Sequence, residues 1–132
     1  MKKTFMVYKT YFKQNKYGAK RTVANDGIKR DSKFEAGVAD DLLMRKQSGD
    51  IKDYDSQFKV EMSAYRKNGE PAFKMTHKVD FRIHHNDGSF ELLEAKGVET
   101  ADYKIRRKFL EQLWLPDNLD HTYTVVKQRT YR

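Results

Sequence analysis

Cysteine is absent from this chain, and proline occurs only twice, at Pro71 and Pro116. The lack of cysteine excludes a disulfide framework, thiolate zinc sites, iron–sulfur clusters and thiol catalysis, and it suits a reducing compartment. No apolar run approaches the roughly 20 residues that a membrane-spanning helix needs. Residues 1–9 are basic but lack the apolar segment and cleavage site of a signal peptide. We therefore expect a cytoplasmic protein with no membrane contact.

The 132 residues, 38% of them hydrophobic and 13% aromatic, are enough for one domain with a modest core. The formal charge of +8 comes entirely from residues 1–33, which hold ten basic and two acidic residues, whereas the remainder holds 17 of each. We expect a basic, aromatic arm over residues 1–15 and a domain over residues 16–132. Basic side chains neutralise phosphates and aromatic rings stack on bases, so this pattern favours nucleic-acid contact. The alternative is a solvated basic tail whose aromatic rings cover the core.

Hydrophobic spacing and turn residues predict the order of the elements. A small hairpin is expected first, turning at Asn25-Asp26-Gly27, followed by a helix, three strands, a second helix stopped by Pro116, and a last strand. The apolar side of the second helix is expected to include Ile105, Phe109 and Leu113. This order predicts an α/β (α+β) fold with a mixed four-to-five-stranded sheet and flanking helices. The expected ranges are 20–30, 31–48, 57–65, 74–85, 90–96, 101–115 and 122–127.

The loop Asn86-Asp87-Gly88 decides how two strands pair. A two-residue turn would pair Asp80 with Ala95 and place Asp80 and Glu94 on opposite faces. A three-residue loop with Gly88 in the left-handed conformation pairs Asp80 with Glu94 instead. It also gathers the apolar side chains on one face, so we expect this second register. Those side chains are Val79, Phe81, Ile83, Leu93 and Ala95.

Two adjacent carboxylates destabilise a sheet unless a cation lies between them. Magnesium is a natural occupant, because it takes one or two carboxylates and completes its shell with water and phosphate oxygens. Lys96 has the same strand parity as Glu94 and could stabilise charge on a phosphate. The alternative is an ordinary surface cluster of Asp80, Glu94 and Lys96.

Glu35 lies at the edge of the apolar side of the first helix, where it could join these acids. The sequence Ser32-Lys33-Phe34-Glu35 also fits a capping box, and the two roles are compatible. His84 and His85 point to opposite faces by alternation, which argues against a shared metal. His77 is expected at the surface, with proton transfer at the edge of the site as the alternative.

Glu35, Asp80 and Glu94-Ala95-Lys96, in this order and on this layout of elements, resemble the PD-(D/E)XK nuclease superfamily. Several further segments resemble the small phage endonucleases described as Holliday junction resolvase-like. The resemblance covers residues 16–127 and departs from the superfamily at Val79, where a proline is usual. The segments are 16–20, 27–36, 49–51, 57–58, 79–81 and 94–97.

This resemblance implies a restriction-endonuclease-like core and a hydrolase that cuts DNA with Mg²⁺, for which Mn²⁺ can substitute. Asp80, Glu94, the Ala95 carbonyl and Glu35 would hold the metal, Lys96 would be the catalytic cation, and Gln57 would lie beside the site. The implied substrate is branched DNA, the implied assembly is a homodimer, and the implied location is the host cytoplasm of a phage. The alternatives are a non-catalytic DNA-binding or modulator protein on the same fold, and an RNA nuclease. The expected DNA-binding side chains are Lys16, Lys20, Arg21, Lys33, Lys104, Arg107 and Lys108.

Overall fold

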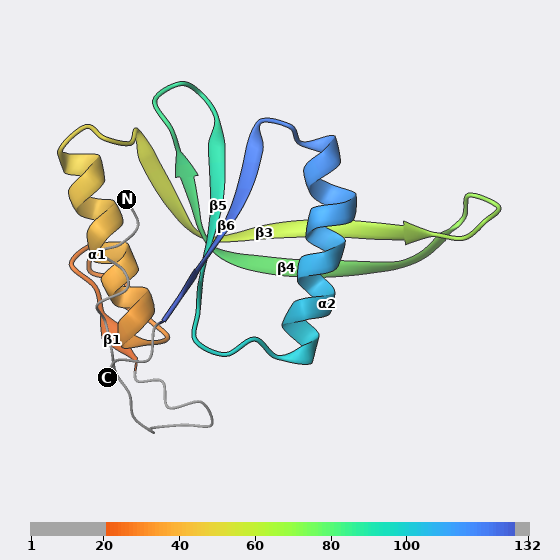
Figure 1. The fold of residues 1–132 in the computed structure, drawn as a ribbon, viewed down its shortest axis with the longest axis horizontal. Coiled ribbons are helices and arrows are strands. Elements are labelled where there is room, and N and C mark those ends of the chain that lie inside the picture. The colour runs from red at the N-terminus through yellow and green to blue at the C-terminus, as the bar shows by residue number, and fades with distance from the viewer. Residues whose placement is uncertain (1–20, 129–132) are drawn as a thin grey trace.

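The computed structural model describes residues 21–128 (Figure 1). These residues form a mixed α+β domain with a two-stranded sheet, a four-stranded mixed sheet and two main helices, which confirms the expected fold class. The elements are β1 (Thr22–Val23), β2 (Lys29–Arg30), α1 (Lys33–Gln47), β3 (Asp53–Tyr65), β4 (Pro71–His84), β5 (Phe90–Lys96), α2 (Ala101–Phe109), the π-helical turn η2 (Leu110–Trp114), the 3-10 turn η3 (Leu115–Asp117) and β6 (His121–Lys127).

The β1–β2 hairpin leads directly into α1, as the sequence predicted. Gly27 lies in the left-handed region, at φ +85°, where a residue with a side chain would be strained. Ser32 caps α1, because its hydroxyl accepts a hydrogen bond from the Glu35 N–H at 3.0 Å. Phe34, Val38 and Leu42 recur at helical spacing and are buried against the sheet. Local sequence alone therefore fixes the start and the orientation of α1.

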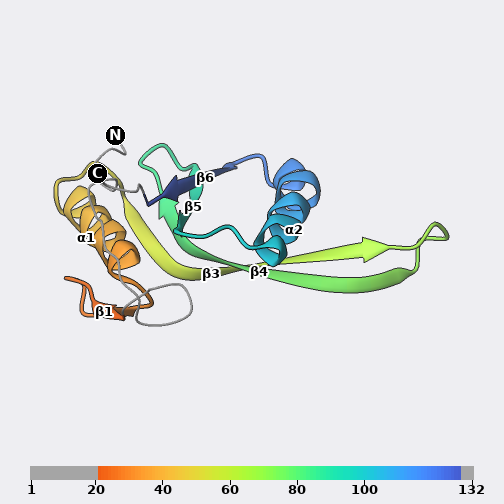
Figure 2. The same ribbon diagram turned by 60° about the horizontal axis from the view of Figure 1, so that its bottom comes forward.

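The main sheet has the strand order β3-β4-β5-β6, in which β5 and β6 are parallel and the other pairs are antiparallel. The parallel pair is joined by α2, as such a crossover requires. Leu93 packs with α1 and its neighbour Leu92 packs with η2, so the two helical segments cover opposite faces. Figure 2 shows α1 at one end of the sheet and α2 on the other side, over the long β3–β4 ribbon.

The predicted helix–strand–strand–strand–helix–strand order is confirmed, with three differences in detail. β3 begins at Asp53 rather than residue 57, because it extends past an irregularity at Gln57. The second helix changes from α to π at Leu110. Its expected apolar side is only partly correct: Phe109 packs against the second core cluster, but Ile105 and Leu113 are exposed, whereas Tyr103 and Leu110 are buried. Tyr103 and Leu110 are seven residues apart and face the sheet, so amphipathic spacing was present but was assigned to a neighbouring stripe.

The expected single apolar face of β4 and β5 is only partly correct. Phe81, Ile83 and Leu93 lie in one cluster with α1, and Ala95 packs against it. Val79 instead lies with Leu92 and Leu110 in the second cluster, on the side of η2. The strand therefore changes face between Val79 and Phe81, and Asp80 lies at the change.

Within residues 21–128, no helix combines the length and the apolar character needed to cross a bilayer. The expected arm over residues 1–15 lies outside the described residues, as do Lys16 and Lys20.

Candidate active site at the end of the β4–β5 ladder

Asp80 and Glu94 lie where β4 and β5 stop pairing. The ladder runs from His84↔Phe90 to Phe81↔Leu93, so the next opposed pair in this register is Asp80 and Glu94. There the Asp80 N–H donates to Glu94 Oε2 at 3.3 Å, and the Ala95 N–H donates to Asp80 Oδ2 at 2.8 Å. Each carboxylate thus binds an amide of the opposite strand. The two acids are brought together in the gap between the strands, as the register argument predicted.

The three-residue loop sets this register. The His85 N–H donates to the Ser89 carbonyl at 2.9 Å, which pairs His85 with Ser89. Gly88 has φ +91°, the left-handed conformation that this loop requires. The predicted loop type and strand register are therefore confirmed.

Glu94 is buried and is held by donors from β4 and β6. His77 Nε2 donates to Glu94 Oε1 at 2.9 Å, and the Tyr123 hydroxyl donates to the same oxygen at 3.3 Å. Because the Tyr123 hydroxyl donates its proton to Glu94, its oxygen accepts the hydrogen bond from the Tyr103 hydroxyl at 2.7 Å. Burial raises the pKa of both tyrosines, which keeps them protonated as donors. The expectation of a surface His77 is wrong, since its side chain is buried beside Glu94.

Glu35 extends the acidic cluster from the start of α1. Its side chain is 6% exposed, and no ion pair or hydrogen bond of its carboxylate is found within residues 21–128. Burial raises its pKa to about 7, with Asp31 and Glu94 acting in the same direction and Arg30 and Lys96 opposing. The pKa of Asp80 is also raised well above its usual range, first by burial and then by Glu35 and Glu94. Three acids therefore share one electrostatic environment. Of the expected capping box, only the bond from the Glu35 backbone N–H to Ser32 is formed; the Glu35 carboxylate binds no N–H within residues 21–128.

Lys96 lies beside this cluster without an acidic partner from the described residues. Its Nζ is 4.2 Å from the centre of the Tyr103 ring, a cation–π contact. Lys96 opposes the raised pKa of both Glu35 and Asp80, so its charge acts on both acids. Since the N–H and C=O of one strand residue point to the same neighbouring strand, the Ala95 carbonyl faces the gap that holds Asp80.

Gln57 lies on β3 opposite Asp80, because Ser56 pairs with Phe81 and Phe58 pairs with Val79. Its backbone is left-handed at φ +55°, the only such non-glycine residue in the described chain. Left-handed backbone costs a residue with a side chain about 1–2 kcal/mol. The residue expected beside the site is therefore also the strained residue of the sheet.

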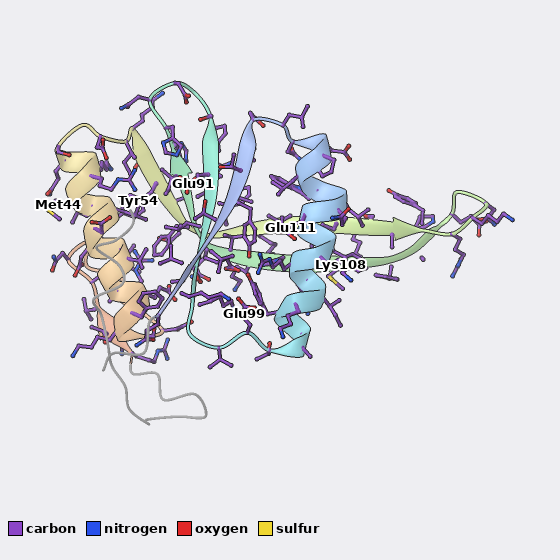
Figure 3. All side chains as sticks on the ribbon, in the orientation of Figure 1. Met44, Tyr54, Glu91, Glu99, Lys108 and Glu111 are labelled. Carbon is purple, nitrogen blue, oxygen red and sulfur yellow. The ribbon has the colours of Figure 1, made fainter. Side chains whose placement is uncertain are left out.

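Of the expected DNA-binding side chains, those within residues 21–128 lie just before β1, on α1 and on α2. Arg21 is exposed and lies 3.7 Å from Asp31, and Lys33 is exposed in the first turn of α1. Lys104 and Lys108 are exposed on α2; Figure 3 labels Lys108 there and Glu111 on the following turn η2. Arg107 is bound by Glu99 and Glu111, so it is the least available cation of the set.

Three features of the site were missed by sequence reasoning. Arg30 is 2% exposed, lies over the Phe81 ring at 5.1 Å, and binds Asp26 and Ser56. Tyr54, between β3 and α1 in Figure 3, donates to the same Asp26. His77 has the same strand parity as Val79, and this alternation was the signal that it is buried.

The donor set suits a hard divalent cation, although the acids are not gathered around one point. Within residues 21–128, no three His, Asp or Glu side chains are grouped to hold a metal ion. Magnesium needs only one or two carboxylates, with water and phosphate oxygens completing its shell. Asp80 and Glu35 meet this need, because each is an oxygen donor that forms no ion pair with the described residues and whose pKa is raised. Glu94 is a weaker ligand here, because both of its oxygens already accept hydrogen bonds.

The fold and site define a small mixed α+β domain with an acidic cluster and one lysine where two strands separate. The chain belongs to the DUF1064 family, described as proteins of unknown function, whose family model matches residues 14–130. Comparison with the curated proteins and with the solved structures gave no match.

Proposed function

We propose that this protein is a metal-dependent DNA endonuclease of the PD-(D/E)XK type that hydrolyses phosphodiester bonds. The observation that supports this most directly is the pair of hydrogen bonds by which Asp80 and Glu94 each accept from a backbone N–H of the opposite strand, at the end of the β4–β5 ladder. It brings two carboxylates together beside Glu35 and Lys96, and two of the three acids have a raised pKa. Such a cluster is costly in a folded protein unless a cation binds there.

Asp80 would hold Mg²⁺ or Mn²⁺, with Glu94, the Ala95 carbonyl and Glu35 as the other candidate ligands. The bound ion would supply Lewis acidity and lower the pKa of water at the site. Glu35, whose pKa in the metal-free chain is about 7, would accept a proton from an attacking water wherever it is not itself a ligand of the ion. Lys96 would stabilise negative charge on the scissile phosphate, for which its ammonium is free of acidic partners from the described chain.

The target that we propose is branched or junction DNA, on the basis of the resemblance to the phage resolvase-like endonucleases. Cutting a junction symmetrically requires two active sites related by a two-fold axis, so we propose a homodimer. The exposed cations Arg21, Lys33, Lys104 and Lys108 would contact backbone phosphates around the site.

A second function is supported by the state of Glu94. Its oxygens are bound by His77, Tyr123 and the Asp80 amide, and no three-residue metal group is formed within residues 21–128. A DNA-binding protein without catalysis would also fit that arrangement. An RNA nuclease would use the same acids, and only the substrate distinguishes it.

The test is cleavage of supercoiled plasmid, four-way junction, flap and single-stranded DNA in Mg²⁺ and in EDTA. We expect cleavage by the wild type in Mg²⁺ only. Asp80→Asn and Lys96→Ala should each reduce the rate by at least about 100-fold, which is about 2.7 kcal/mol of transition-state stabilisation. The matched controls are the exposed Asp117→Asn and Lys52→Ala, which should cut as the wild type does.

Inactivity of the wild type on all four DNA substrates, with retained DNA binding, would favour the non-catalytic protein. Preferential cutting of an RNA competitor would favour the RNA nuclease. Equal loss of activity in Asp80→Asn and Asp117→Asn would show that the acids of the gap have no special role.

A further inference from the structure

The β3–β4 ribbon extends well beyond the helix that covers it. Its two strands, Asp53–Tyr65 and Pro71–His84, are longer than any other in the described chain. Figures 1 and 2 show its outer half projecting past α2. Phe58, Val60 and Met62 pack on the side of η2. On the other side of the outer ribbon, Figure 2 shows no element formed by residues 21–128.

The uncovered face of the ribbon is basic. By alternation it carries Lys59 and Glu61 from β3 and Lys74, Thr76 and Lys78 from β4, all of them exposed. The register places Lys59 directly opposite Lys78, Ser63 opposite Lys74, and Glu61 opposite Thr76. We call Lys59, Lys74 and Lys78 the lysine face. Glu61 is the one acid on this stretch of the ribbon, so the face has an excess of positive charge.

The Lys59–Lys78 pair has no obvious structural purpose. Like charges directly opposite each other destabilise a sheet. No ion pair of Lys59, Lys74 or Lys78 is found within residues 21–128. At the tip, Arg66 is 3.6 Å from Glu70, and Lys67 is exposed without an ion pair from those residues. An anionic partner would turn this repulsion into a favourable interaction.

The lysine face begins at the candidate active site. Lys78 is two residues from Asp80 along β4, and its partner Lys59 is two residues from Gln57, which lies opposite Asp80 on β3. α1 covers the other end of the sheet and contributes Glu35 to the cluster. At about 3.3 Å per residue, the strand spans about 20 Å from Asp80 to Lys74. One strand of a duplex carries about six phosphates over this length of the helix axis. The acidic cluster around Asp80 and the lysine face therefore adjoin each other along the ribbon.

We propose that the lysine face of the β3–β4 ribbon binds the backbone phosphates of a DNA duplex whose scissile phosphate lies at Asp80. The inference rests on the proposed nuclease function and adds the surface that positions its substrate. Phosphates match the face in charge, and lysines bind them without regard to base sequence. The lysine face lies on β3 and β4, separate from the cations of α1 and α2 described above.

The first experiment compares Lys59→Gln/Lys78→Gln with Lys46→Gln/Lys52→Gln, two exposed lysines at the end of α1 and the start of β3. Binding of the full chain to a fluorescein-labelled 30-base-pair duplex is measured by anisotropy in EDTA over a salt series. The face variant should bind more weakly than the wild type. Its slope of log affinity against log salt should decrease by about 1.8, since each phosphate contact contributes about 0.9. The control pair should keep the wild-type slope within about 0.5, because fewer phosphates lie within its reach.

A second variant separates binding from folding. Lys59→Glu places an opposite charge across from Lys78, which should raise the midpoint of urea unfolding. The same change should weaken binding to the duplex, because the face loses two units of charge. A more stable protein with weaker binding excludes unfolding as the cause of the loss.

Wild-type affinity in both face variants, or an equal loss in the control pair, would overturn the proposal. Failure of the wild type to bind the duplex, or stronger competition by an RNA duplex than by DNA, would overturn it too. Because EDTA prevents cleavage, these outcomes are independent of the nuclease test. A protein that binds through the lysine face but never cuts would refute the proposed activity alone.

Discussion

His77 Nε2 lies 2.9 Å from Glu94 Oε1, and both side chains are almost fully buried. The contact joins β4 to β5 beyond the point where their backbone ladder has ended. Because Glu94 is a carboxylate removed from water, its hydrogen bonds must offset the cost of its burial. His77 therefore holds a strand junction together as well as orienting an acid of the candidate site.

Replacing His77 by Ala should destabilise the fold. The change removes a donor from a buried carboxylate, so we expect the free energy of unfolding in urea to fall by about 2–3 kcal/mol. The matched control is His85→Ala, which removes a half-buried histidine from Glu91 and should cost less than about 1 kcal/mol. Adding Glu94→Gln to His77→Ala should recover part of the loss. A loss no larger than that of His85→Ala would contradict the structural role of His77.

Glu35 should make the metal-free protein less stable as the pH rises. Its pKa is about 7 in the folded chain against an ordinary value of 4.5, so between these values the folded state holds a proton that the unfolded state releases. Stability conferred by this proton is present below about pH 4.5 and is lost as the pH rises through about 7, by up to about 3 kcal/mol. The raised pKa of Asp80 likewise lowers the stability of the folded chain as the pH rises.

Thermal unfolding of the wild type and Glu35→Gln between pH 4.5 and 8 tests this in EDTA. The variant should lose less stability over the range, and the exposed Glu61→Gln should follow the wild type. If the stability of the wild type and of Glu35→Gln changed equally with pH, the raised pKa of Glu35 would be ruled out.

Divalent cations should stabilise the wild type above pH 7. Burial first, and repulsion among the acids second, raise the pKa of Asp80 and Glu35, and a bound cation offsets both effects. A ligand present at 100 times its dissociation constant adds about 2.7 kcal/mol. Thermal shift with MgCl₂ and with CaCl₂ should show this increase. Asp80→Asn should abolish it, whereas Asp117→Asn should not. An equal shift in both variants would place the ion elsewhere.

Gln57→Gly should remove the strain in β3. At φ +55° glycine is favoured by about 1–2 kcal/mol over a residue with a side chain, less the greater freedom of glycine in the unfolded chain. We expect a net gain in stability of about 0.5–1 kcal/mol for Gln57→Gly and a clear loss for Gln57→Val, both by urea unfolding. If the glycine variant is also slower in cleavage, the strained conformation contributes to the geometry of the site.

Most of the fold was predictable because its local signals agree. The turn at Asn25-Asp26-Gly27, the Ser32 cap and the Asn86-Asp87-Gly88 loop each require one conformation, and the structure has it. The register of β4 and β5 followed from the loop, so the proximity of Asp80 and Glu94 followed as well. Local chemistry therefore determined more of the candidate site than any long-range argument did.

The features that the sequence did not predict depend on tertiary packing, and the spacing of apolar residues along one element carries no information on that packing. Val79 and Phe81 lie in different core clusters at the point where the β4–β5 ladder ends, which alternation along β4 does not reveal. Ile105 and Leu113 are exposed, whereas Leu110 and Trp114 pack with Val60 and Met62 of β3. The metal, the substrate and the dimer stay predictions.

Surface loops usually accept insertions and deletions without penalty, but the loop between β4 and β5 should be an exception. Removing Asp87 alone would leave a chain that still folds its helices and strands while shifting every residue of β5 by one position against β4. Glu94 would then lose its place opposite Asp80. In this domain, the number of residues in one exposed turn determines whether Asp80 and Glu94 meet.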